Sequence, residues 1–287
     1  MALAEINDEL GAARTNKKEF LEKLEAIIPW ETFFELIQPS YYKGELGNKP
    51  YPLELMLRIF ILQNVYNLAD MAVMNEVIDS RAFSNFCGIN SPSEVPDGDT
   101  IGRFRNILTR NGLQEKIFAA VVKILMERKR ILKKGTIVDS TFIESPSSTK
   151  NREKKRDPEA HSAKKGNTWH FGYKAHIGVD EKSGYIGANK KPEAIKKNKN
   201  GKKIKYLINR RPSSIKKLSK SGQYAAKKKE HQKSSVRCKV EHVFAVIKNI
   251  FRYRKTRYRG LRKQTAKLNI MFALANLYLA ATKSLTV

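Results

Sequence analysis

The chain has 287 residues, two cysteines and a formal net charge of +28 at pH 7. A chain of this length can bury a sizeable core as one large or two modest domains, which excludes a small disulfide-stapled scaffold. The charge predicts a polyanionic partner, most commonly a nucleic acid. Because Cys87 and Cys238 belong to no ligand motif and the five histidines show no metal spacing, neither a disulfide nor a zinc site is expected.

The two ends of the chain predict no contact with a membrane. The opening MALAEINDEL contains acids and no apolar core, so no secretory signal peptide is expected. The apolar run 268–281 is short and is interrupted by Asn269 and Asn276, which is typical of a buried helix. The sequence therefore predicts a cytoplasmic protein, associated with the nucleoid if its polyanion is DNA.

Residues 1–132 are predicted to form an all-helical domain. Apolar residues recur at helical spacing in several segments: 20–28, 30–37, 53–64, 68–78, 101–108 and 113–126. Pro29 and Pro39 are expected to end the first two helices, and Asp99 can cap the helix that follows the loop 92–100, with Arg105 on its outer face. Short helices joined by tight turns can form a DNA-reading helix-turn-helix or a plain helical bundle, and both interpretations stay open.

From Gly135 the pattern changes to short β segments. Residues 136–143 favour a buried strand, residues 146–167 a loop, residues 169–179 a second strand and residues 180–184 a turn. Asp139 lies in the first of these strands. An acid inside a buried strand is costly unless it is paired or binds a cation. The alternative is that Asp139 ends the strand and forms a turn with Ser140.

A helix with a valine stripe is predicted over residues 234–250. Beside this stripe, Arg237, Glu241 and Lys248 fall on a second, narrow stripe at about 100° per residue. Glu241 is one of three acids between Lys182 and Lys263, a span that contains 28 Lys or Arg residues. A single carboxylate in such surroundings is either a counter-ion for its neighbours or a metal ligand.

The next ten residues, 251–260, mix aromatic and basic side chains. The aromatic residues are Phe251, Tyr253 and Tyr258, and the basic ones are Arg252, Arg254, Lys255, Arg257 and Arg259. Such a mixture suits phosphate contacts and stacking on a nucleic acid. A solvated basic surface above three core aromatics is an equal alternative.

Several motifs in this chain resemble those of one protein family. They are the segment 97–106, DSTFIESPSST at 139–149, GNTWHFGYKAHIGVD at 166–180, the spacing Arg237-x3-Glu241-x6-Lys248 and the run 256–261. Together they resemble the insertion-sequence-five family of bacterial DDE transposases over nearly the whole chain. The resemblance implies an α+β fold, with a helical DNA-binding domain at 1–132 and a ribonuclease-H-like α/β core at 133–287.

The resemblance also implies the site. Asp139 and Glu241 match the first and last catalytic acids, which in the family hold two Mg²⁺ ions. The residues expected to contact DNA are Arg237, Lys248, Arg252, Arg254, Arg257 and Arg259. The partner implied is duplex DNA at transposon ends, bound by a homodimer.

The middle catalytic acid has no match in this chain. The position that it should occupy holds Lys182, and residues 178–190 join two parts of the family pattern that are normally far apart. The simplest explanation is an internal deletion. Asp180 is the nearest acid, but it matches a hairpin residue of the family and not the catalytic one.

Three functions remain open. The chain is a DNA transposase by descent with impaired catalysis, a basic DNA- or RNA-binding protein with no catalytic history, or a metal nuclease that uses two acids.

Overall fold

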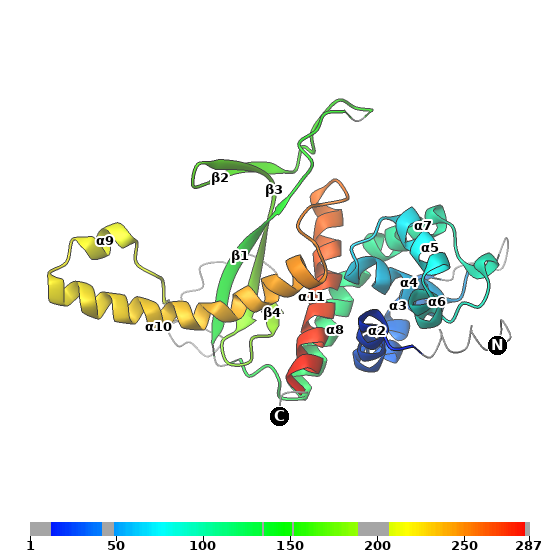
Figure 1. The fold of residues 1–287 in the computed structure, drawn as a ribbon, viewed down its shortest axis with the longest axis horizontal. Coiled ribbons are helices and arrows are strands. Elements are labelled where there is room, and N and C mark those ends of the chain that lie inside the picture. Colours follow the sequence, from blue (N-terminus) through cyan, green and yellow to red (C-terminus); the bar gives the residue numbers. More distant parts are fainter. Residues whose placement is uncertain (1–12, 42–48, 134, 151, 189–206, 285–287) are drawn as a thin grey trace.

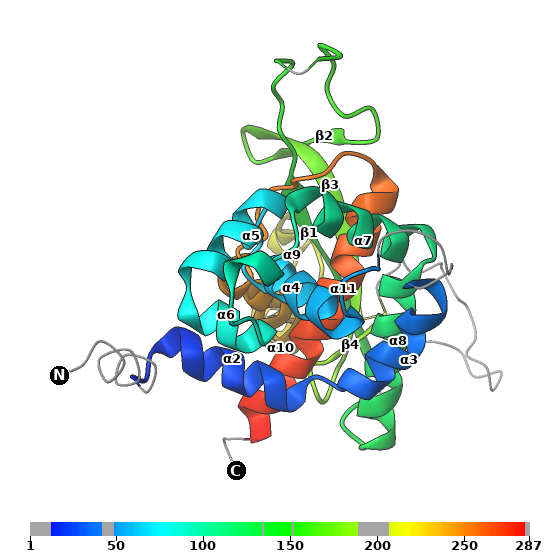
Figure 2. The same ribbon diagram turned by 90° about the vertical axis from the view of Figure 1, so that its right-hand side faces the viewer.

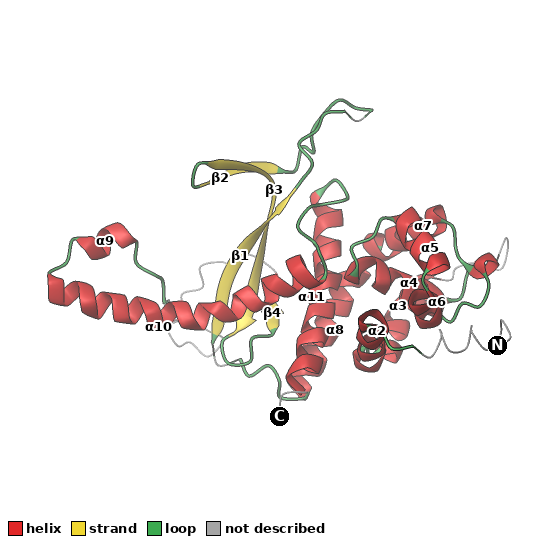
Figure 3. Ribbon diagram, in the orientation of Figure 1, coloured by secondary structure: helices red, strands yellow, loops and turns green. Residues whose placement is uncertain are grey.

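The computed structural model describes residues 13–41, 49–133, 135–150, 152–188 and 207–284. Within them a helical N-terminal region is followed by a small antiparallel sheet and further helices (Figure 3). The predicted α+β class is therefore confirmed. No helix in these ranges is long and apolar enough to cross a lipid bilayer.

The N-terminal region forms the helices expected from its apolar spacing. In chain order these are α2 (Asn16–Ile27), α3 (Trp30–Tyr41), α4 (Leu53–Val65), α5 (Asp70–Asp79), α6 (Arg81–Cys87), the 3-10 turn η1 (Pro92–Glu94), α7 (Gly98–Arg110) and α8 (Leu113–Glu127). The sequence did not predict α6, which is only two turns long. Asn67 takes a left-handed backbone conformation (φ 51°) and separates α4 from α5.

Three details of these helices differ from the prediction. Pro39 lies inside the last turn of α3, where its missing N–H removes only one helical hydrogen bond. The cap of α7 is Asp97, which accepts a 2.6 Å hydrogen bond from the Thr100 N–H, because the helix already begins at Gly98. Arg105 does not point outward, because it is half-buried and pairs with Asp70.

The sheet has four antiparallel strands: β1 (Thr136–Glu144), β2 (His161–Lys165), β3 (Thr168–Asp180) and β4 (Ile186–Ala188). The long strand β3 pairs with all three others, and Asp139 of β1 lies opposite Ile177 of β3. The prediction of an uninterrupted loop over 146–167 is wrong, since β2 lies within it. The prediction that β1 is buried is also wrong, because only Ile143 on it is fully buried and Val138 is 45% exposed.

The remaining helices are α9 (Pro212–Lys216), α10 (Lys220–Ala245), its π-helical continuation η2 (Val246–Ile250) and α11 (Leu261–Ser284). The C-terminal half of α10 crosses β1, while its N-terminal half projects with α9 away from the rest of the chain (Figure 1). Helix α11 runs beside α8 and also contacts α2 and α4 (Figure 2). The hydrophobic core is therefore shared by residues from both sides of residue 132, and the predicted domain boundary at that position stays a prediction.

Candidate functional site

The side chain of Asp139 lies on the face of the sheet that α10 covers. Strand alternation puts it on the same face as the buried residues Ile143 and Ile177. There Arg237 of α10 binds both carboxylate oxygens, with Nε 2.8 Å from Oδ2 and Nη2 3.0 Å from Oδ1. The Ser140 N–H donates a further hydrogen bond of 2.8 Å to Oδ1. This bidentate pair joins α10 to β1 across 98 residues of sequence.

Glu241 lies one helical turn after Arg237 on α10 and is exposed. The hydrogen bonds that Arg237 donates to Asp139, followed by the charges of Asp139 and Glu241, outweigh burial and raise the pKa of the Arg237 guanidinium. The structure thus brings the three predicted residues Asp139, Arg237 and Glu241 to one place. The guanidinium, however, occupies the oxygens of Asp139 that a metal ion would need.

Asp180 is committed to the turn after β3. Its Oδ1 accepts hydrogen bonds from the Ser183 N–H and hydroxyl, both at 2.8 Å, and from the Lys182 N–H, and its Oδ2 accepts one from the Lys133 N–H. Burial alone raises its pKa, but these donors outweigh burial and hold the pKa below the ordinary value. Asp180 pairs with Thr136, which lies three residues before Asp139 on β1. The two acids are therefore about 10 Å apart along the sheet, and their side chains are on opposite faces.

Positive charge gathers at this turn instead of a third acid. The ammonium of Lys239 donates to the carbonyl oxygens of Glu181 and Lys182, and that of Lys283 donates to the carbonyl of Ser183. Burial, followed by the charge of Lys239, lowers the pKa of Lys283.

These residues do not fit a two-metal site. Such a site needs several oxygen ligands around each divalent ion. Asp139 is occupied by a guanidinium and Asp180 by four donors. Within the described ranges no group of three or more His, Cys, Asp or Glu side chains could hold a metal ion. In the described ranges, Asp139 therefore has an ion pair and no group of three candidate ligands around it.

Two of the three aromatic residues of segment 251–260 belong to the core, and the third is half-buried. Phe251 and Tyr253 are fully buried, and Tyr258 lies under the guanidinium of Arg105, 4.2 Å from its ring centroid. These rings are therefore covered and do not stack on a nucleic acid, while contact of the neighbouring arginines with phosphates stays a prediction. The sequence could not distinguish the two alternatives, because a mixture of aromatic and basic residues is the same whether the rings are buried in a core or stack on bases.

The arginines of this segment are exposed, as phosphate contacts require. The carbonyl of Arg252 accepts from the Asn67 side-chain amide, and Arg257 donates to the oxygen of the same Asn67 side chain at 3.3 Å. Arg254 donates to Asn249 and Arg259 to Glu153. Lys248 lies half-buried in η2, and its carbonyl accepts from Arg254.

The net positive charge of the chain comes entirely from its second part. Residues 1–132 contain 16 Lys or Arg against 18 Asp or Glu, whereas residues 133–287 contain 40 against 10. The N-terminal helices thus have no excess of cations for a polyanion. A phosphate-binding surface has to be built mainly by residues after 132.

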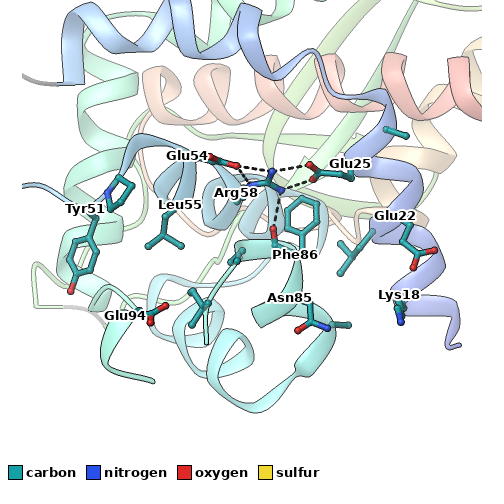
Figure 4. A pocket seen from close by; sticks show the side chains of 17 residues that line it. Lys18, Glu22, Glu25, Tyr51, Glu54, Leu55, Arg58, Asn85, Phe86 and Glu94 are labelled. Atoms are coloured by element: carbon teal, nitrogen blue, oxygen red, sulfur yellow. Dashed lines mark hydrogen bonds and ion pairs between the residues drawn. The ribbon is translucent and has the colours of Figure 1, made fainter. Parts of the chain in front are cut away.

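A cavity of about 950 Å³ lies in the N-terminal helices, away from Asp139 and Glu241 (Figure 4). Its wall includes Arg58, which donates to Glu25 and Glu54 and lies 4.4 Å from the ring centroid of Trp30. Glu22 and Glu94 also line it. An acidic lining does not suit DNA, so this cavity is not part of the phosphate-binding surface.

One buried cation was not predicted from the sequence. Lys267 of α11 is 6% exposed, and its ammonium lies 5.7 Å from the ring centroid of Tyr253. Burial, with the charges of Arg257 and Arg105, lowers the pKa of Lys267 to about 7.

Comparison with known families identifies the chain. Residues 8–107 match the transposase domain DUF772, and residues 131–194 and 190–277 match, in two segments, the transposase DDE domain. The second model covers more than half of the chain, so this protein belongs to the DDE transposase family. No solved structure matches the chain.

Proposed function

We propose that this protein is a DNA transposase of an insertion sequence that binds duplex DNA mainly through phosphates and has impaired catalysis. The observation that supports impaired catalysis is the bidentate contact of Arg237 with Asp139, which competes with metal binding at the acid that the resemblance assigns as the first catalytic one. Glu241 alone cannot hold two divalent ions. Loss of the metals removes both the activation of the nucleophile and the stabilisation of the leaving oxygen, which costs several orders of magnitude in rate.

The missing middle acid supports the same proposal. The DDE model matches in two segments that overlap at residues 190–194, close to the point where the sequence predicts an internal deletion. We further infer membership in the insertion-sequence-five family, a ribonuclease-H-like core that lacks part of its sheet, a Mg²⁺ requirement in intact relatives, and binding to transposon ends as a homodimer on DNA. The expected place is the cytoplasm, on the nucleoid.

A salt titration tests DNA binding. The logarithm of the affinity for a labelled duplex should fall with the logarithm of salt concentration by about 0.9 per neutralised phosphate. Replacing Arg252, Arg254, Arg257 and Arg259 together by Gln should make the slope shallower by up to about 3.6. The matched control replaces exposed arginines of the N-terminal helices, Arg103 and Arg128, and should leave the slope unchanged. A salt-independent affinity would contradict the proposal, and equal competition by unrelated RNA would favour a general nucleic-acid-binding protein.

An end-cleavage assay tests the impairment. The full chain with transposon-end DNA and Mg²⁺ or Mn²⁺ should give no cleavage or joining. Robust metal-dependent cleavage that Asp139→Ala and Glu241→Ala abolish would show the impairment claim to be wrong. Loss of that cleavage in Asp180→Ala as well would identify Asp180 as the third acid.

A further inference from the structure

One tryptophan of this chain is left in solvent. The chain has two tryptophans. Trp30 packs between Phe34 and Phe86, whereas Trp169 is 67% exposed. Tryptophan is strongly buried on average in folded proteins, so an indole this exposed is unusual. It lies at the start of β3, next to the turn that contains Gly166 (φ 61°).

The surroundings of Trp169 are cationic. Lys164 of β2 is its partner in the register, with its ammonium 6.0 Å from the ring centroid. Residues 160–179 contain three lysines and three histidines but no acid. His170, the next residue on β3, contacts Glu144 through Nδ1 at 3.0 Å. An exposed ring beside a lysine, on a hairpin without acids, has the composition of a stacking platform for single-stranded nucleic acid.

The position of this hairpin suits contact with bound DNA. In Figure 1 the β2–β3 end of the sheet projects away from the N-terminal helices. On β3, Trp169 lies eight residues before Ile177, the residue that pairs with Asp139. Eight residues of strand place Trp169 up to about 26 Å from Ile177. At about 3.4 Å per base pair, DNA bound along the strand would present a base to Trp169 roughly eight base pairs from Asp139.

We propose that Trp169 stacks on an unpaired or unstacked base of the DNA that this protein binds. In an intact duplex the faces of each base are covered by its neighbours, so only a base that has left the stack offers its face to an indole. The proposal deepens the proposed function and rests on it. A second copy of this chain on the hairpin is the competing occupant, and the experiment separates the two.

The first measurement uses the affinity of the full chain for two fluorescein-labelled DNAs of equal length. One is a perfect duplex, and the other carries a short unpaired gap at its centre. Trp169→Ala should weaken binding to the gapped DNA by about 5- to 140-fold, the range expected for one base-stacking contact, and change duplex binding by less than about twofold. Trp169→Phe should keep part of the preference. Tyr224→Ala, which removes a 75% exposed aromatic of α10, is the matched control and should have no effect.

The second measurement uses fluorescence. In Trp30→Phe the remaining indole is Trp169, and its emission should be quenched by the gapped DNA more than by the duplex. If the first measurement shows binding to neither labelled DNA, the proposed function fails. If both bind, but Trp169→Ala leaves their ratio unchanged, the stacking proposal is overturned and DNA binding stands. A fluorescence change with protein concentration alone, without DNA, assigns the hairpin to contact between copies and also overturns it.

Discussion

Replacing the buried Lys267 by Met should stabilise the protein near neutral pH and remove a pH dependence. In the unfolded chain a lysine titrates near 10.5, whereas burial and two arginine charges lower the pKa of Lys267 to about 7. The unfolded state therefore binds the proton more tightly between these two values, so the stability of the wild type rises with pH across that window. Met keeps the length and apolar stem of the side chain without an ionisable group.

The magnitude follows from the shift. A full difference of about 3.5 pKa units corresponds to about 5 kcal/mol as a ceiling, of which about 2 kcal/mol should be recovered between pH 7 and pH 9. Other groups titrate there too: burial raises the pKa of the Cys87 thiol to about 12, so the unfolded state ionises first and stability falls above about pH 9. That contribution is common to both proteins and cancels in their difference.

The assay is urea denaturation of the wild type and Lys267→Met at pH 7 and pH 9, followed by circular dichroism. The variant should be the more stable protein at pH 7, and its advantage should shrink by about 2 kcal/mol at pH 9. An equal difference between the two proteins at both pH values would refute the reasoning, because the ammonium would then titrate alike in both states.

Three further variants test the fold around the site by urea denaturation or thermal melting. Arg237→Gln, which breaks the pair with the mostly buried Asp139 carboxylate, should cost about 1–2 kcal/mol, while Glu241→Gln should be near neutral; equal effects would contradict a specific clamp. Asp180→Ala should lower the free energy of unfolding by about 3 kcal/mol above pH 5. Because the pKa of Asp180 is lowered in the folded state, the wild type should lose this stability only as the pH falls below about 4, and a variant as sensitive to acid as the wild type would count against this. Gly172→Ala puts a methyl group onto the Ile143 carbonyl oxygen and should cost at least about 2 kcal/mol, whereas Gly187→Ala meets open space; matching melting temperatures would exclude the clash.

The sequence predicted best what local spacing determines. The N-terminal helices follow from their apolar period, and the turn at 180–184 from its composition. Strand β2 was missed because its residues, HSAKK, show no alternation, and its only reason to be a strand is the partner β3.

The site was predicted in part for the same reason. From the sequence, Glu241 was expected as a counter-ion for neighbours on its own helix, and Arg237 lies four residues before it. The structure instead directs Arg237 to Asp139, which offers two oxygens from a different element. The burial of Lys267 and the exposure of Trp169 depend on which elements lie nearby, and no local pattern contains that information.

The packing of α11 has a consequence for how the chain is made. Its residues are synthesised after every other described element, yet they cover apolar surfaces on α2, α4 and α8. Until residues 261–284 leave the ribosome, those helices expose a face that can aggregate or bind a chaperone. A chain that ended before Leu261 would therefore leave these apolar faces of α2, α4 and α8 uncovered.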